Sequence, residues 1–332
     1  MAQTVLVTGG TGFIAGWCIV QLLERGYVVR TTVRDAAKEQ RVRAAAGAGN
    51  SDRLEVVVAD LNDDRGWDAA VAGCDYVLHV ASPLGGGIVT DRNALIAPAR
   101  DGTLRVLRAA AKAGVKRVVM TSAAATARPP LTSNRVSDET VWADAEDPQF
   151  DAYRVSKILA ERAAWDFVKG EGKSTLLTTI LPGAVFGPIR DAENLGSVQI
   201  IQGMLHGRPG ALPRLGFWIV DVRDLADLHI RAMTADAAAG QRFIAAGEFM
   251  WMADIAKTLR AQLGEKGAKV PTRRLPNLVV RLLLPFMANL RSLAPLLGRR
   301  FPINTEKSRK VLAFTPRPAD ITLVDCARSL LD

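Results

Sequence analysis

Short apolar runs alternate with amphipathic segments through the first half of the chain. Segments between the runs repeat apolar positions every three or four residues, which predicts helices. Three of these helices, 13–25, 101–113 and 151–169, end at Gly26, Gly114 and Gly170, a common C-terminal signal. The apolar runs are mostly β-branched, as in strands that helices cover on both faces: 5–8, 28–33, 54–59, 76–80, 118–122 and 176–181. This alternation predicts an α/β fold with a doubly wound, Rossmann-type parallel sheet.

The pattern weakens after about residue 186, where prolines recur. Two later segments return to it: 221–224 is expected to open a helix, and 242–245 to form a strand. We therefore expect residues 1–185 to form an NADP-binding Rossmann domain, with returns to the sheet near residues 218–246. Residues 186–332 should form mainly a smaller, mostly C-terminal α/β substrate region.

The most apolar later stretch is 278–297. It contains Arg281, Pro285 and Arg291, so we do not expect it to span a membrane. Two interpretations stay open, a helical hairpin that covers a pocket and an apolar face that lies on a membrane. The first predicted strand begins almost at the first residue, without the pattern of a signal peptide, which favours a cytoplasmic protein.

Composition narrows the function classes. The 332 residues are 48% hydrophobic and 23% charged, as in ordinary globular proteins. Three cysteines are too few and too scattered for a disulfide framework or a zinc site, and the three histidines have no metal-ligand spacing. The net charge of +9 is spread along the chain without an aromatic-basic motif. We therefore expect no nucleic-acid partner and no metal, although a polyanionic cofactor would suit this charge.

A glycine-rich turn follows the first predicted strand, with the sequence Thr8-Gly9-Gly10-Thr11-Gly12-Phe13-Ile14-Ala15. Gly9 allows a tight turn, Gly12 allows the backbone to approach a pyrophosphate, and the small Ala15 allows close packing of helix on strand. The helix that follows directs N–H groups and a positive dipole end at the phosphates. Because the turn lies between a strand and a helix, it predicts a dinucleotide site.

The end of the second strand indicates which dinucleotide binds. Arg34 stands where an NAD enzyme usually has an acidic residue, and its guanidinium can pair with a 2′-phosphate. Arg41, one or two helical turns further on, is a second candidate charge. Asp35 either contacts the ribose hydroxyl or caps the next helix. Asp60, followed by Leu61, is placed to accept a hydrogen bond from the adenine amino group or to cap a helix. We therefore predict NADP(H).

Tyr153 and Lys157 are four residues apart on a predicted helix, so their side chains share one face. A phenol ordinarily titrates near pH 10. A nearby ammonium and a positively charged nicotinamide favour the phenolate, which would allow Tyr153 to exchange a proton with a substrate oxygen. Lys157 would also hold the nicotinamide ribose.

These motifs resemble the extended short-chain dehydrogenase/reductase superfamily, and within it the dihydroflavonol reductase-like and aldehyde/ketone reductase branch. The resemblance covers nearly the whole chain. Besides the glycine turn and the Tyr–Lys pair, the matching segments are 32–35 (TVRD), 59–61 (ADL), 79–83 (HVASP), 181–183 (LPG), 185–188 (VFGP), 220–224 (VDVRD) and 307–316 (KSRKVLAFTP).

The resemblance implies an enzyme that reduces a ketone or aldehyde to an alcohol with NADPH, with Tyr153 as general acid and Lys157 as its partner. The nicotinamide would lie against Val80, Ala81, Ser82, Pro182, Gly183 and Val185. Candidates for the substrate pocket are Ser82, Pro83, Leu84, Phe217 and Trp218, with packing in the core as the alternative for the two aromatic residues.

One departure from the family pattern concerns the end of the fifth strand. The family usually has a catalytic serine as the second Ser of Thr-Ser-Ser, and this chain has Thr121-Ser122-Ala123-Ala124. Either the local chain is shifted and Ser122 holds the substrate oxygen, or Ala123 occupies the family position. In the second case the site would work with Tyr153, Lys157 and water, with Thr126 as a further candidate. We lean towards Ser122 as a catalytic residue.

Two other functions stay open. The first is a sugar-nucleotide epimerase or dehydratase, or a steroid-type dehydrogenase, on the same scaffold. Arg34 argues against it, because enzymes that recycle their cofactor usually retain NAD. The second is a non-catalytic dinucleotide sensor, which the missing serine favours and the Tyr153–Lys157 pair disfavours. We expect a small-molecule carbonyl or alcohol substrate. Its identity, the stereochemistry, the physiological direction and the oligomeric state, a homodimer included, stay open.

Overall fold

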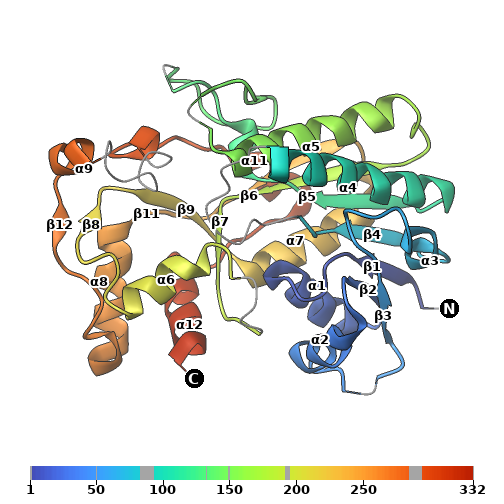
Figure 1. Ribbon diagram of the computed structural model, residues 1–332, viewed down its shortest axis with the longest axis horizontal. Helices are drawn as coiled ribbons and strands as arrows, with labels where there is room; N and C mark the ends of the chain where they lie inside the picture. Colours follow the sequence, from blue (N-terminus) through green and yellow to red (C-terminus); the bar gives the residue numbers. More distant parts are fainter. Residues whose placement is uncertain are drawn as a thin grey trace.

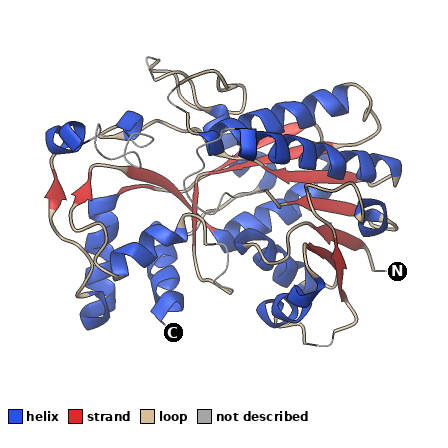
Figure 2. Ribbon diagram, viewed as in Figure 1, coloured by secondary structure: helices blue, strands red, loops and turns tan. Residues whose placement is uncertain are grey.

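The computed structural model describes residues 2–49, 51–82, 93–131, 133–148, 150–190, 195–283 and 294–331. Within these ranges a seven-stranded sheet has the order β10-β6-β5-β4-β1-β2-β3 (Figures 1 and 2). Its neighbouring strands pair in parallel. The strands are β1 (Thr4–Val7), β2 (Val28–Val33), β3 (Leu54–Val58), β4 (Tyr76–His79), β5 (Arg117–Thr121), β6 (Leu177–Pro182) and β10 (Gln241–Ala245). The predicted doubly wound parallel sheet is confirmed.

Helices cover both faces of this sheet. In the view of Figure 1, α4 and α5 lie above it, and α1 and α7 lie below it. Each layer has its own apolar core, because strands buried on both faces present alternate side chains to each layer. The helices of the sheet are α1 (Phe13–Glu24), α2 (Glu39–Ala46), α3 (Trp67–Val71), α4 (Asn93–Lys112), α5 (Ala152–Lys169), α7 (Val222–Thr234) and α11 (Glu306–Leu312).

A further apolar core lies beside the carboxyl ends of the strands, at the left in Figure 1. It contains residues of α6, α8, α12 and β9. The elements of this part are α6 (Val198–Leu205), α8 (Met252–Leu263), α9 (Asn277–Leu283), α12 (Ala319–Leu331), β7 (Ala184–Phe186), β8 (Leu212–Pro213), β9 (Gly216–Asp221), β11 (Phe249–Trp251) and β12 (Arg274–Leu275). The domain boundary expected at residue 185 stays a prediction.

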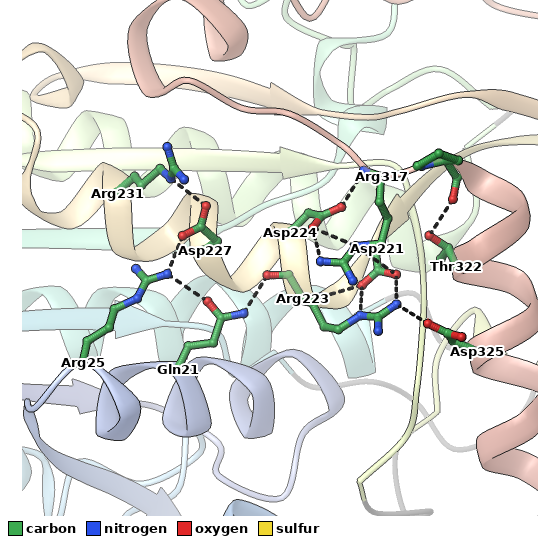
Figure 3. A network of polar contacts seen from close by, with 11 residues as sticks. Gln21, Arg25, Asp221, Arg223, Asp224, Asp227, Arg231, Arg317, Thr322 and Asp325 are labelled. Atoms are coloured by element: carbon green, nitrogen blue, oxygen red, sulfur yellow. Dashed lines mark hydrogen bonds and ion pairs between the residues drawn. The ribbon is translucent and has the colours of Figure 1, made fainter.

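Ion pairs around the start of α7 tie the last helix of the chain to the sheet (Figure 3). Asp221 caps α7, accepting from the backbone N–H of Arg223 at 2.8 Å, and its buried carboxylate pairs with the Arg223 guanidinium. Arg223 also contacts Asp325 of α12 at 2.8 Å, and Arg317 pairs with Asp224 at 2.6 Å. The segment 221–224 thus opens a helix, as predicted, and connects α7 with α12.

The main differences from the predicted elements lie at helix ends. Helix α4 begins at Asn93 rather than near residue 101. Gly26 and Gly114 have positive φ angles of +84° and +68°, as expected at helix ends, whereas Gly170 has φ −100°. The apolar stretch 278–297 is described only in part, as α9 and the short helical turn η5 (Ala294–Leu296). Among the described residues, no helix is long and apolar enough to cross a membrane.

Candidate active site

A single cavity of about 1050 Å³ runs along the carboxyl ends of the central strands. In open α/β sheets ligands bind at this edge. Of the predicted site residues, those that line the cavity are Gly9, Thr11, Gly12, Phe13, Ile14, Arg34, Asp60, Leu61, Val80, Ala81, Ser82, Ser122, Tyr153, Lys157, Pro182, Gly183 and Val185. Arg41 is exposed and does not line it. The fold thus brings together residues from most of the predicted motifs.

The glycine turn between β1 and α1 requires its glycines. Gly9 has φ +77°, and a Cβ added there would lie 3.0 Å from the Ala81 Cβ. Gly12 caps α1, and a Cβ on it would lie 3.0 Å from the Gly9 carbonyl oxygen. The first N–H groups of α1 have no carbonyl partner within the helix. Because the turn lines the cavity, these N–H groups are available to a pyrophosphate.

Buried hydroxyl groups fix this turn to the neighbouring strands. Thr8 Oγ1 accepts hydrogen bonds from the N–H groups of Val80 and Ala81, at 3.1 and 2.9 Å, and lies 3.0 Å from His79 Nδ1. Thr32 Oγ1 accepts from the Gly9 N–H at 2.9 Å. Burial, assisted by Lys157, lowers the pKa of His79 to about 3. His79 is therefore a neutral part of the scaffold at physiological pH.

Arg34 and Lys38 line the end of the cavity beyond the glycine turn. Asp35 caps the helical turn that follows, accepting from the Ala37 N–H at 2.9 Å. This is the capping alternative considered for Asp35. Asp60 also makes a local turn, accepting from the Asn62 N–H at 2.9 Å, while still lining the cavity. Lys38 was not predicted as a site residue, because a lysine in a charged helical segment belongs to no recognisable motif.

Tyr153 and Lys157 lie one turn apart on α5 and both face the cavity. Lys157 is 5% exposed and its Nζ donates to the Thr121 carbonyl oxygen at 3.2 Å. Burial lowers the pKa of Lys157 to about 8, against an opposing effect of the Glu161 carboxylate. Tyr153 is 39% exposed along the cavity, and desolvation of its phenol raises its pKa. This is the opposite of the shift expected from a nearby ammonium.

The Ser122 hydroxyl is part of a buried polar network. Its Oγ donates to Glu161 Oε2 at 2.6 Å. Glu161 is fully buried, accepts from Thr179 Oγ1 at 2.8 Å and pairs with Arg242 Nε at 2.9 Å. Ser122 and Ala123 both line the cavity. The Ser122 hydroxyl is thus bonded to Glu161, and Ala123 offers no hydroxyl to the cavity; a catalytic role for Ser122 stays a prediction.

Thr126, the other candidate, is also bound within this network. Its Oγ1 donates to the Ala123 carbonyl oxygen at 2.9 Å and accepts from Arg242 Nη2 at 3.1 Å. Thr126 is fully buried and does not line the cavity. It therefore supports the strand end rather than offering a hydroxyl to a ligand.

Aromatic residues line the cavity on the side of the C-terminal region. Phe217 and Trp218 are among them, as predicted, and the Trp218 ring contacts Phe249 edge-on at 5.6 Å between centroids. Trp218 Nε1 donates to the Phe301 carbonyl oxygen at 2.7 Å. Pro83 and Leu84, the other predicted pocket residues, lie outside the described residues. Arg128, which no sequence motif marks, also lines the cavity and contacts the ring of Phe301.

Comparison with known proteins gives one consistent result. The model of the NAD-dependent epimerase/dehydratase family matches residues 5–246. A ketoreductase of Aspergillus niger, azaE, is 34% identical, covering 100% of this chain and 98% of its own, and dihydroflavonol 4-reductase of Arabidopsis thaliana is 35% identical over 79% and 70%. The crystal structure of yeast methylglyoxal/isovaleraldehyde reductase Gre2 with NADPH has a TM-score of 0.83 at 28% identity, covering 99% of this chain and 98% of that one.

Proposed function

The chain belongs to the NAD-dependent epimerase/dehydratase family, and from this membership we propose that it is an NADPH-dependent reductase of ketones or aldehydes. The observation that carries the proposal is the continuity of one cavity. It connects Arg34 and the glycine turn, which suit a phosphorylated dinucleotide, with Tyr153 and Lys157, which suit proton transfer. Relatives that are a ketoreductase and a dihydroflavonol 4-reductase support the direction of the reaction.

Each chemical group of NADPH has suitable residues along the cavity. The N-terminus of α1 would receive the pyrophosphate. Arg34 and Lys38 would hold the 2′-phosphate, since a guanidinium and an ammonium both pair with phosphate oxygens. Asp60 would accept from the adenine amino group. Lys157 would hold the nicotinamide ribose, with Ala81 and Val185 among the residues beside the ring.

Bound NADPH supplies a hydride to the carbonyl carbon. Tyr153 donates its phenolic proton to the carbonyl oxygen, so it must hold that proton when the substrate arrives. The raised pKa of the phenol serves this direction, because it keeps Tyr153 protonated at neutral pH. The Lys157 ammonium stabilises the phenolate that results. The proton and the charge that stabilises its loss are thus one helical turn apart.

Lys157 is held for this task by its surroundings. The Thr121 carbonyl oxygen accepts from its Nζ, and Glu161 lies one turn further along α5. Glu161 raises the pKa of Lys157 while burial lowers it, and the result is about 8. We infer that Lys157 is charged at neutral pH and loses its charge in mildly alkaline solution.

A test of the function measures NADPH oxidation with a panel of aromatic and aliphatic ketones and aldehydes, with NADH in parallel. Tyr153→Phe keeps the ring and removes the proton donor. We expect it to lower kcat on the order of 10²-fold or more, with NADPH binding unchanged. Full activity of Tyr153→Phe would refute the mechanism. Turnover of a sugar nucleotide without net cofactor oxidation would instead indicate an epimerase or dehydratase.

A further inference from the structure

Arg128 is a buried cation that lines the cavity. It follows the short helical turn η2 (Ala124–Ala127) after β5, and it is 9% exposed. Among the described residues, its guanidinium makes no hydrogen bond or ion pair, and its Nε is buried without an acceptor. Buried charged groups are normally paired, because an unpaired one loses its hydration without compensation.

The other two buried arginines have protein acceptors for their Nη groups, although Arg117 Nε, like Arg128 Nε, is buried without an acceptor. Arg242 pairs with Glu161 and donates to the carbonyl oxygens of Glu139 and Val141 at 2.9 and 2.7 Å. Arg117 donates to the carbonyl oxygen of Ala232 at 3.1 Å. Arg128 has no such acceptor, and unlike these two it lines the cavity. Its free donors therefore point to a ligand.

Aromatic rings hold the Arg128 guanidinium in place. Its central carbon lies 4.5 Å from the ring centroid of Phe150 and 5.2 Å from that of Phe301. Such cation–π contacts fix a guanidinium without using its N–H donors. Burial and the charge of Arg154 lower the pKa of Arg128 to about 10, so it still carries its charge at neutral pH. A fixed, charged guanidinium thus lines the cavity.

Nearby acidic groups do not neutralise this guanidinium. Asp151 is bound to Arg154, through both the cap of α5 and an ion pair. Asp147 and Asp151 both raise the pKa of Arg128, but less than burial and Arg154 lower it, and neither forms an ion pair with Arg128 among the described residues. The positive charge at this side of the cavity is therefore available to a ligand anion.

We propose that Arg128 binds a carboxylate of the substrate, so that the enzyme's substrates are carbonyl compounds with an apolar or aromatic body and an acid group. A planar carboxylate can accept two parallel hydrogen bonds from a guanidinium. The rings of Phe217, Trp218 and Phe249, which line the same side of the cavity, suit the apolar body. This inference rests on the proposed reductase function and specifies its substrate class.

The test compares each acid with its neutral ester. Suitable pairs are 4-carboxybenzaldehyde with methyl 4-formylbenzoate, and 4-oxo-4-phenylbutanoate with its methyl ester. In the wild type we expect kcat/KM to favour at least one acid by roughly 10- to 150-fold, the worth of a hydrogen-bonded charge pair. Arg128→Met should remove this preference while retaining turnover of the ester, and Arg128→Lys should retain part of it.

Arg299→Met is the matched control. Arg299 also lines the cavity, but it is exposed and donates to the Leu131 carbonyl oxygen. It should leave the acid-to-ester ratio unchanged. An equal preference for acid and ester in the wild type would overturn the proposal. So would an equal loss on both substrates in Arg128→Met, or a raised KM for NADPH alone, since Arg128 would then serve the cofactor or the fold.

Binding separates this inference from the reductase function. Titration calorimetry would measure 4-(hydroxymethyl)benzoate binding to the wild type and to Arg128→Met, each with NADP⁺. Binding lost in the variant, together with no carbonyl reduction in the wild type, would retain the Arg128 site and refute the reductase. Reduction of neutral carbonyls only, without binding of the carboxylate, would retain the reductase and refute the site. If Arg128→Met does not fold, the wild-type ratios and Arg128→Lys still decide.

Discussion

Replacing Ser122 with alanine tests whether the hydroxyl at the end of β5 serves the substrate or the fold. In the structure the hydroxyl donates to Glu161 at 2.6 Å, inside a fully buried network. Ser122→Ala removes one donor from a carboxylate that keeps Thr179 and Arg242. We therefore expect a loss of stability and little change in kcat.

The size of that loss follows from the kind of bond removed. A hydrogen bond to a charged group contributes about 1.5–3 kcal/mol. Because the Glu161 carboxylate is buried, water cannot replace the missing donor without rearrangement. For a chain of 332 residues the corresponding fall in Tm is about 2–4 °C. Removal of the whole ion pair by Glu161→Gln should have a larger effect, about 3–5 kcal/mol, since the buried Arg242 would lose its counter-charge.

The assay combines thermal unfolding, NADPH binding and steady-state kinetics on the best carbonyl substrate. Ala123→Ser is the matched variant, because Ala123 also lines the cavity and is the alternative candidate for the family position of the serine. We expect Ala123→Ser to raise kcat or leave it unchanged, with an unaltered Tm. A fall in kcat on the order of 10²-fold or more in Ser122→Ala at unchanged Tm would refute this reasoning and make Ser122 a catalytic residue.

Two further predictions concern the cofactor and the proton. Arg34→Ala should weaken NADPH binding roughly 10- to 150-fold and leave NADH binding nearly unchanged; equal effects in a fluorescence titration of both cofactors would exclude contact with the 2′-phosphate. The kcat/KM for reduction should fall as pH rises through about 8, where Lys157 loses its charge. Glu161→Gln should move this fall to lower pH, because Glu161 raises the pKa of Lys157; an unmoved profile would assign it to another group.

The sequence predicted the sheet because strands buried on both faces have a local signature. The runs 28–33 and 54–59 became β2 and β3 to within a residue. The resemblance to extended short-chain dehydrogenases/reductases is also confirmed, by the family model and the relatives. The start of α4 was missed by eight residues, because Pro98 within the segment suggested that the helix begins after it. The order of the strands and the formation of the further apolar core beside the strand ends depend on contacts between distant segments. No local pattern in the sequence contains these contacts.

The candidate site shows a similar division. Motif positions such as Gly9, Asp60 and Tyr153 line the cavity because each follows a strand or lies on a helix whose place in the fold is fixed. The sequence did not identify Arg128 and Lys38 as residues of the cavity. A basic residue without a motif cannot be distinguished from a surface charge until its position in the fold is known. The role of Ser122 depended on Glu161, a partner 39 residues away in the chain.

The segment after β5 connects the missing serine with the unpaired arginine. Ser122 and Thr126 commit their hydroxyls to the buried Glu161–Arg242 network, and the alanine at position 123 offers none to the cavity. A substrate oxygen then has Tyr153 as its hydrogen-bond donor, and one donor alone fixes orientation poorly. An anchor at Arg128 would restore that orientation from the other end of the substrate, because binding energy at a remote group can be used to position the reacting one. Acid-bearing substrates should therefore have a higher kcat and a lower KM than their esters, which would bind in many orientations.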